Sequence, residues 1–179
     1  MTARDAVLDA YQAILLEHGQ RATTLAAVAA KAGVSKGGLL YHFTSKEALA
    51  AGLIARLDDL IDEDLREMSA AQDGPSRYYV RTSVWTDGPL DRTLVAVAQL
   101  AQESHADART AMSRARRQWL ALIREEVGEE ATAHAILLLG DGLYFDAALS
   151  GGIDPDREDQ FSAEHLMPIV DRLLDAALA

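Results

Sequence analysis

The chain has 179 residues and a net charge of −11, and its 49% hydrophobic and 25% charged residues support a folded core and argue against disorder. It contains no cysteine, which excludes disulfides and thiolate metal sites. The N-terminal residues lack the features of a signal peptide, and the apolar run at 135–140 is too short to span a membrane, so we expect a soluble cytoplasmic protein with no membrane partner.

Helices are the only regular structure that we predict. Leucine and alanine dominate, and no stretch alternates apolar and polar residues for long, so the fold class is expected to be all-α. The first helix places Val7, Tyr11, Ile14 and Leu15 on one face and ends near Gly19.

Two short helices and one long helix follow. The second is predicted at 25–32, with Thr23 or Thr24 as its N-cap, and the third follows residues 33–35 and ends near Phe43. A capping box from Thr44 to Glu47 is predicted to start the fourth helix. Its inner stripe is apolar and consists of Leu49, Leu53, Leu57, Leu60, Ile61, Leu65 and Met68.

Breaks in the pattern divide the remainder into five further helices. The clearest break is Gln72-Asp73-Gly74-Pro75, and another contains Gly151-Gly152 and Pro155. Proline removes one backbone donor, so Pro168 should kink the last helix. The predicted helices are 76–86, 90–104, 106–127, 130–149 and 162–178.

The segment Thr23–Phe43 has the features of a helix-turn-helix. Ala29 is small where two helices must approach, and Gly33 follows where a tight turn needs positive φ. An ordinary corner in a helical core is the alternative, but two glycines in so short a helix cost about 2 kcal/mol relative to alanine, which indicates a helix ordered partly by its target. Ser35 can cap this helix and leave Lys36, Gly37, Gly38, Tyr41 and His42 available to a major groove and its phosphates.

The charge distribution agrees with this interpretation. Residues 1–52 hold five basic and four acidic residues, whereas residues 53–179 hold 12 basic and 24 acidic ones. The three lysines, Lys31, Lys36 and Lys46, all lie in the first segment. Because phosphates supply much of the affinity for DNA, an acidic body with a locally basic N-terminal segment is typical of a protein that presents one face to DNA.

The stretch AAVAAKAGVSKGGLLYHFTSKEAL closely resembles the N-terminal signature of the TetR family of repressors, in which a turn of the AGVSKG type is followed by LYxHF and SKEAL. The resemblance covers about residues 5–53. It implies a three-helix helix-turn-helix DNA-binding domain at 1–52 and a helical ligand-binding and dimerisation domain at 53–179. We expect no cofactor and no metal. Gly38 and Leu39-Leu40 stand where many members have a different residue before the tyrosine, which leaves base specificity open.

The resemblance also implies a role for each matching residue. Thr24 and Lys46 would contact phosphates at the N-termini of two helices, where free backbone donors favour anions. Tyr41 and His42 would contact the DNA backbone or a base edge. The complete set of predicted DNA-binding residues is Thr24, Ser35, Lys36, Gly37, Gly38, Tyr41, His42 and Lys46.

The last two helices are predicted to form a homodimer interface, because members of this family pair through them. The segment Ala131–Leu149 is apolar on nearly all sides, and the last helix adds further apolar residues. The alternative is that both helices fill the core of a monomer.

Asp141 interrupts the apolar segment, and a buried carboxylate is costly unless it is paired. It therefore either meets an arginine or waits for a cationic or hydrogen-bonding ligand. Short stretches around Trp119 and Tyr144 resemble a multidrug-binding TetR subgroup. We predict a mostly apolar pocket whose ligand-binding residues are Trp85, Trp119, Asp141, Tyr144 and Phe145, with plain core packing as the alternative for the aromatic ones.

The sequence thus predicts a transcriptional repressor that a small hydrophobic inducer, which can be cationic, releases from palindromic double-stranded operator DNA. An enzyme is the first alternative, but we find no phosphate-binding glycine loop, no HExxH motif and no metal-ligand spacing among the five histidines, so no catalytic or metal-binding residue is predicted. The second alternative is a helical ligand-binding or scaffold protein that has lost DNA binding.

Overall fold

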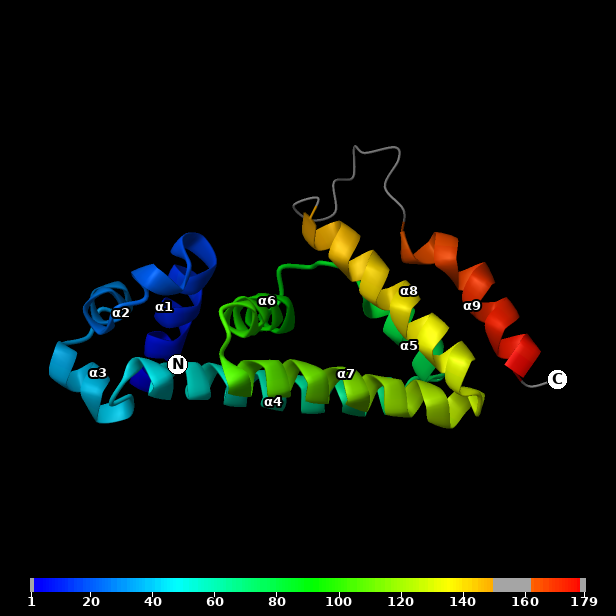
Figure 1. The fold of residues 1–179 in the computed structure, drawn as a ribbon, viewed down its shortest axis with the longest axis horizontal. Helices are drawn as coiled ribbons and strands as arrows, with labels where there is room; N and C mark the ends of the chain where they lie inside the picture. The colour runs from blue at the N-terminus through cyan, green and yellow to red at the C-terminus, as the bar shows by residue number, and fades with distance from the viewer. Residues whose placement is uncertain (1, 150–161, 178–179) are drawn as a thin grey trace. The chain divides into compact units, whose positions relative to one another are not determined.

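A computed structural model describes residues 2–149 and 162–177 of the chain (Figure 1). These residues form nine α-helices and one 3-10 turn, and no strand occurs within the described ranges. The chain packs into two units. One comprises Met1–Ile61 with Pro89–Arg114, and the other comprises Asp62–Gly88 with Ala115–Ala179.

The first unit contains the N-terminal helices. Its elements are α1 (Ala3–His18), the 3-10 turn η1 (Gln20–Ala22), α2 (Leu25–Ala32), α3 (Lys36–His42), the first part of α4 (Lys46–Ser69), α6 (Pro89–Gln102) and the first part of α7 (Ala106–Val127). Helix α1 packs against α2, α3 and α6. The buried apolar face that was predicted for α1 is confirmed, and the core of the unit includes Val7, Leu8, Tyr11, Leu15, Val28, Leu39, Leu49, Leu53, Leu57, Val97 and Leu100.

Local capping sets the helix-turn-helix. Thr24 Oγ1 accepts a hydrogen bond from the Ala27 amide at 3.1 Å, so Thr24 rather than Thr23 is the N-cap of α2. Gly33 ends α2 with φ +67°, a left-handed conformation that costs a residue with a Cβ about 1–2 kcal/mol. Ser35 Oγ then accepts from the Gly38 amide at 3.0 Å and starts α3. The predicted turn is therefore confirmed.

The predicted capping box at Thr44 is wrong by one residue. Helix α4 starts at Lys46, and the hydroxyl of Ser45 accepts from the Ala48 amide at 3.2 Å. Glu47 is then the second residue of the helix, whereas a capping box needs it at the third. Both Thr44 and Ser45 can cap a helix, so local preference alone did not distinguish them.

A polar junction joins three helices inside the first unit. Arg56 on α4 donates to Asp9 Oδ1 at 2.7 Å and to Gln12 Oε1 at 3.3 Å on α1. Thr93 on α6 also reaches Gln12 Oε1 at 3.3 Å. Because Gln12 and Thr93 are buried, these bonds restrict α1, α4 and α6 to one register on one another.

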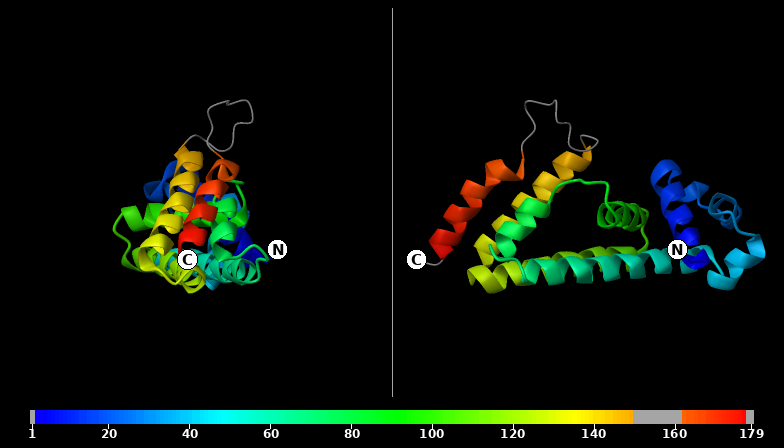
Figure 2. Two further views of the ribbon diagram at one scale, coloured as in Figure 1. Left: turned by 90° about the vertical axis from the view of Figure 1, so that its right-hand side faces the viewer. Right: turned by 180° about the vertical axis from the view of Figure 1, so that it is seen from behind.

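The second unit contains the rest of α4 and α7, together with α5 (Pro75–Thr82), α8 (Glu130–Leu149) and α9 (Ala163–Ala177). Helix α5 packs against α8 and α9, which also contact each other (Figures 1 and 2). The described helices include none that is both long and apolar enough to cross a membrane. The core consists mainly of Met68, Tyr79, Val80, Ile123, Val127, Ile136, Leu137, Leu143, Leu166, Val170 and Leu174.

Helix boundaries in this half follow the predictions except at α5, which ends at Thr82 instead of residue 86. The hydroxyls of Thr82 and Ser83 donate to the carbonyls of Tyr78 at 2.9 Å and Tyr79 at 2.6 Å, and such side-chain bonds compete with a further helical turn. Pro168 lies inside α9, and a kink there stays a prediction. The predicted break at 151–155 and the last predicted helical residue, Leu178, lie outside the described residues.

Gly140 on α8 allows α5 to approach closely, which leads to a stability prediction. A Cβ at Gly140 would lie 2.5 Å from the Tyr79 ring and 2.7 Å from Ser83 Oγ. We expect Gly140→Ala to lower the free energy of unfolding by about 1–3 kcal/mol, as overpacking does. A Cβ at Gly37 would have Ser35 Oγ as its nearest neighbour, at 3.9 Å. Gly37→Ala should therefore change the free energy of unfolding by less than about 1 kcal/mol. Urea denaturation of both variants checks this, and equal midpoints would contradict it.

Candidate nucleic-acid interface and ligand-binding residues

The predicted DNA-binding residues gather on α2, the turn, α3 and the start of α4, all within the first unit. Seven of the eight are exposed, and Lys46 is half-buried. The exposed residues are Thr24, Ser35, Lys36, Gly37, Gly38, Tyr41 and His42.

Helix α3 has one buried and one exposed face. Leu39 is fully buried, whereas the Tyr41 side chain is 84% exposed and its ring meets the His42 ring edge-on at 5.0 Å. A Cβ at Gly37 would meet no close neighbour, so packing within the unit does not require glycine there. The exposed face therefore presents a large aromatic hydroxyl, a histidine, a lysine and bare backbone, a set suited to phosphates and base edges.

Lys46 is bound within the protein. Its ammonium group donates to the backbone carbonyl of Gln20 in η1, which connects the start of α4 to the segment before α2. Gln20 was missed by the sequence analysis, because no local pattern signals a contact with a residue so distant in sequence. The phosphate contact of Lys46 stays a prediction.

Two other basic residues of the first unit also interact with neighbouring side chains. Lys31 on α2 pairs with Glu17 at 3.1 Å. Arg4 lies over the Phe43 ring, 5.2 Å from its centroid, next to the end of α3. Arg4 was not singled out from the sequence, because only the fold brings the start of α1 to the end of α3.

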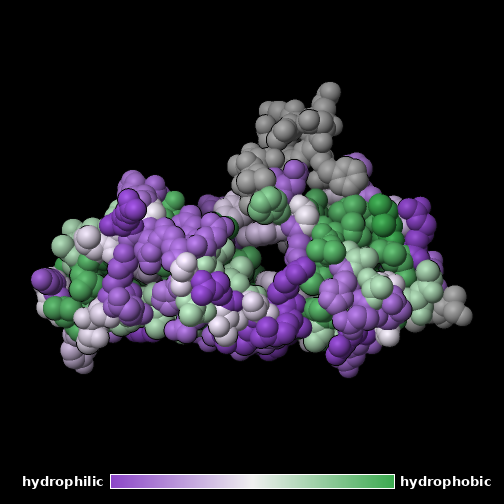
Figure 3. All heavy atoms as spheres, in the orientation of Figure 1, coloured by the Kyte–Doolittle hydropathy of each residue, from purple (hydrophilic) through white to green (hydrophobic). Residues whose placement is uncertain are grey.

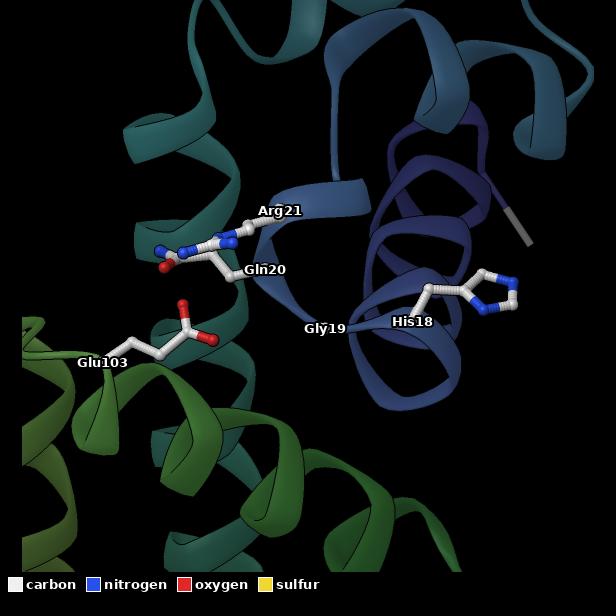
Figure 4. Close-up of a pocket in the computed structure, with 5 residues that line it drawn as sticks. All are labelled: His18, Gly19, Gln20, Arg21 and Glu103. Carbon is white, nitrogen blue, oxygen red and sulfur yellow. The ribbon is translucent and has the colours of Figure 1, made fainter.

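The first unit also has a surface pocket of about 480 Å³ between the end of α1, η1 and the end of α6. Figure 4 shows the side chains of Gln20 and Arg21 extending toward the Glu103 carboxylate, while His18 turns away. Gly19 completes the lining. Four of the five lining residues carry polar or charged side chains, and none of the five predicted ligand-binding residues lines this pocket.

In the second unit, Asp141 meets an arginine, which was one of the two alternatives for it. Arg116 on α7 pairs with Asp141 Oδ2 at 2.8 Å, and the Tyr79 hydroxyl donates to Asp141 Oδ1 at 2.7 Å. Burial and the adjacent Asp141 carboxylate both raise the pKa of Tyr79, so the hydroxyl keeps its proton and remains a donor. The charge of Asp141 is therefore balanced within the protein.

The predicted aromatic ligand-binding residues are distributed over three places. Trp119 lies 5.8 Å from the Tyr79 ring and donates through Nε1 to Asp64 Oδ2 at 2.7 Å. Trp85 and Tyr144 form a second pair, with ring centroids 6.1 Å apart. Phe145, also on α8, is 64% exposed.

Asp64 is the residue of this region that the sequence analysis missed. Burial raises the pKa of its carboxyl group, although hydrogen bonds from Trp119 and Tyr78 act in the opposite direction. A signal was present, because Asp64 follows Ile61 by three residues and precedes Met68 by four on the predicted apolar stripe of α4. No group of three or more histidine and acidic side chains suited to a metal ion occurs in the described part of the chain.

Comparisons with known proteins agree with this architecture. Residues 7–53 match the family model of bacterial regulatory proteins of the tetR family, and residues 73–177 match the tetracyclin repressor-like C-terminal domain. No curated protein matches the sequence.

Solved structures share the fold at low identity. A TetR family member from Streptomyces coelicolor A3, SCO1917, is 18% identical with a TM-score of 0.74 and covers 97% of this chain and 98% of its own. The multidrug binding protein EbrR complexed with malachite green is 18% identical with a TM-score of 0.70, covering 95% and 96%. A transcriptional regulator from Rhodococcus sp. Rha1 is 22% identical with a TM-score of 0.63, covering 99% and 96%. The chain belongs to the TetR family of bacterial regulatory proteins and is a DNA-binding transcriptional regulator with a ligand-binding domain.

Proposed function

We propose that the protein is a repressor that binds a palindromic operator as a homodimer and leaves it when a small hydrophobic inducer, neutral or cationic, binds. Residues 1–52 would bind the DNA, and residues 53–179 would bind the inducer and form the dimer. The protein would act in the cytoplasm, where the operator lies. The observation that carries the proposal is the capped helix α3, which leaves Tyr41 84% exposed beside bare backbone.

Each protomer would place α3 in a major groove. Lys36, Gly37 and Gly38 would face the groove, and the two exposed rings of Tyr41 and His42 would reach the backbone or a base edge. Thr24 and Ser35 cap the two helices of the motif, so their amides and hydroxyls would lie beside the flanking phosphates. Lys46 would have to exchange its Gln20 carbonyl for a phosphate.

The inducer would bind in the second unit, where Trp119, Trp85 and Tyr144 provide aromatic surface. EbrR, which shares the fold, is complexed with malachite green, an aromatic cation. We propose a ligand of the same broad class for this protein. The exposed position of Phe145 favours a role at the dimer interface instead.

Release would follow from linkage between the two sites. A dimer that binds successive major grooves must hold its recognition helices about 34–36 Å apart. An inducer that prefers a conformer with another separation weakens DNA binding, and DNA weakens inducer binding by the same factor.

A salt titration on DNA from upstream of the protein's own gene tests this function. We expect binding to one palindrome to weaken steeply as salt rises, with a slope that reports the phosphate contacts. Fluorescence anisotropy with a scrambled duplex as control measures it. Equal affinity for both duplexes at low salt would instead favour a helical ligand-binding protein without an operator.

A further inference from the structure

Asp64 and Asp141, two partly buried carboxylates of the second unit, are not equivalent. Asp141 pairs with Arg116 at 2.8 Å and accepts from Tyr79 at 2.7 Å. Asp64 accepts from Trp119 Nε1 at 2.7 Å and from the Tyr78 hydroxyl at 3.2 Å, both of which are neutral donors. Among the described residues no arginine, lysine or histidine forms an ion pair with Asp64, so its charge is uncompensated.

Tyr78 is shared between two carboxylates. Its hydroxyl lies 3.2 Å from Asp64 Oδ1 and 3.0 Å from Glu67 Oε2, but it has a single proton to donate. At any moment one of these carboxylates therefore lacks this bond. Arg81 lies over the Tyr78 ring, 5.9 Å from its centroid, but pairs with Asp73 and does not reach Asp64. The group formed by Asp64, Glu67 and Tyr78 therefore has more hydrogen-bond acceptors than donors, and its net charge is negative.

The surroundings of Asp64 match one kind of ligand. The indole of Trp119 bonds one oxygen of the carboxylate and the phenol of Tyr78 bonds the other, and the Tyr79 ring lies 5.8 Å from the indole. Aromatic rings attract organic cations. A bound cation would also supply the positive charge that Asp64 and Glu67, which share the Tyr78 hydroxyl, lack. Burial of Asp64 strengthens such an attraction, because screening by water is weaker there.

We infer that Asp64, and not Asp141, is the residue that makes the inducer site selective for aromatic cations. This inference rests on the proposed function, since it names the charge preference of the proposed inducer site. The Asp141–Arg116 pair then has a structural role in holding α8 against α7.

Binding of ethidium, an aromatic cation, and of phenanthridine, its neutral ring system, to the full-length protein at pH 7.5 tests the inference by calorimetry. We expect Asp64→Asn to weaken ethidium binding at least about tenfold and to change phenanthridine binding by less than about twofold. Asp64→Glu keeps the charge and should retain the preference for ethidium. Asparagine can still accept from Trp119, so the variant should fold, and its melting temperature verifies this.

The matched control removes the other carboxylate together with its arginine. The double variant Arg116→Gln, Asp141→Asn leaves the net charge unchanged and should alter ethidium affinity by less than about threefold. The inference is overturned if the wild type prefers neither compound, if it binds neither, or if Asp64→Asn keeps the preference. Operator binding, measured in parallel, separates this inference from the proposed repressor function. If the protein binds ethidium through Asp64 but binds no palindrome, the repressor function is refuted and the role of Asp64 stands.

Discussion

Replacing Tyr41 by alanine is expected to weaken operator binding about thirtyfold or more and to leave the melting temperature unchanged. The side chain is 84% exposed and its ring meets the His42 ring edge-on, so its removal costs the protomer little. A contact to a base edge or phosphate contributes about 1 kcal/mol or more, and a dimer makes it twice. Fluorescence anisotropy with the palindromic duplex gives the affinity, and differential scanning fluorimetry gives the stability.

Two lysines provide the matched comparison for the same surface. Lys36 is exposed at the start of α3, whereas Lys31 on α2 is paired with Glu17 at 3.1 Å. We expect Lys36→Ala to lower the slope of log affinity against log salt by about two for the dimer, and Lys31→Ala to leave it unchanged. If Tyr41→Ala and Lys36→Ala both bound like the wild type, α3 would not be the recognition helix.

The helices and the turn could be predicted because their signals are local. Apolar spacing showed the buried faces of α1 and α4, and capping residues marked the starts of α2 and α3. Gly33 was predicted to adopt positive φ because a tight turn needs it there, and the structure has it at +67°. Where two adjacent residues could serve equally, as Thr44 and Ser45 could, the boundary was missed.

The contacts between helices could not be predicted in the same way. Asp141 was identified as needing a partner, but nothing local distinguishes Arg116 from the other arginines of α7. The bond from Lys46 to Gln20 and the bond from Trp119 to Asp64 likewise join residues far apart in sequence. Such pairs depend on which helix faces which, and a single sequence contains little information on that.

Asp141 and Asp64 show how this limit affected the prediction of the ligand site. An acidic residue in an apolar helix attracted attention to Asp141, although that residue is balanced by an arginine. Asp64 lies in a helix rich in acidic residues, so its position on the buried stripe was less conspicuous. Burial without a cationic partner, and not rarity in the local sequence, distinguishes a carboxylate that is available to a ligand.

A glutamate at Phe145 is expected to convert the protein to a monomer and to weaken operator binding by at least about a hundredfold. Phe145 is 64% exposed and Leu138, seven residues earlier on α8, is 58% exposed. Figure 3 shows hydrophobic residues gathered over α8 and α9, the helices that we propose to pair with a second copy. Burying one such side chain stabilises by about 1.5–3 kcal/mol, and a two-fold interface contains each of them twice.

The same symmetry makes the substitution severe. A two-fold interface contains each substitution twice, so two charged glutamates would have to be buried where two rings had packed. The protomer should stay folded, because the replaced ring is mostly in contact with water. Ala121→Glu, at an exposed position on α7, serves as the control and should remain dimeric. Sedimentation velocity decides the matter: a Phe145→Glu protein that sediments as a dimer and binds the palindrome would show that the pairing surface lies elsewhere.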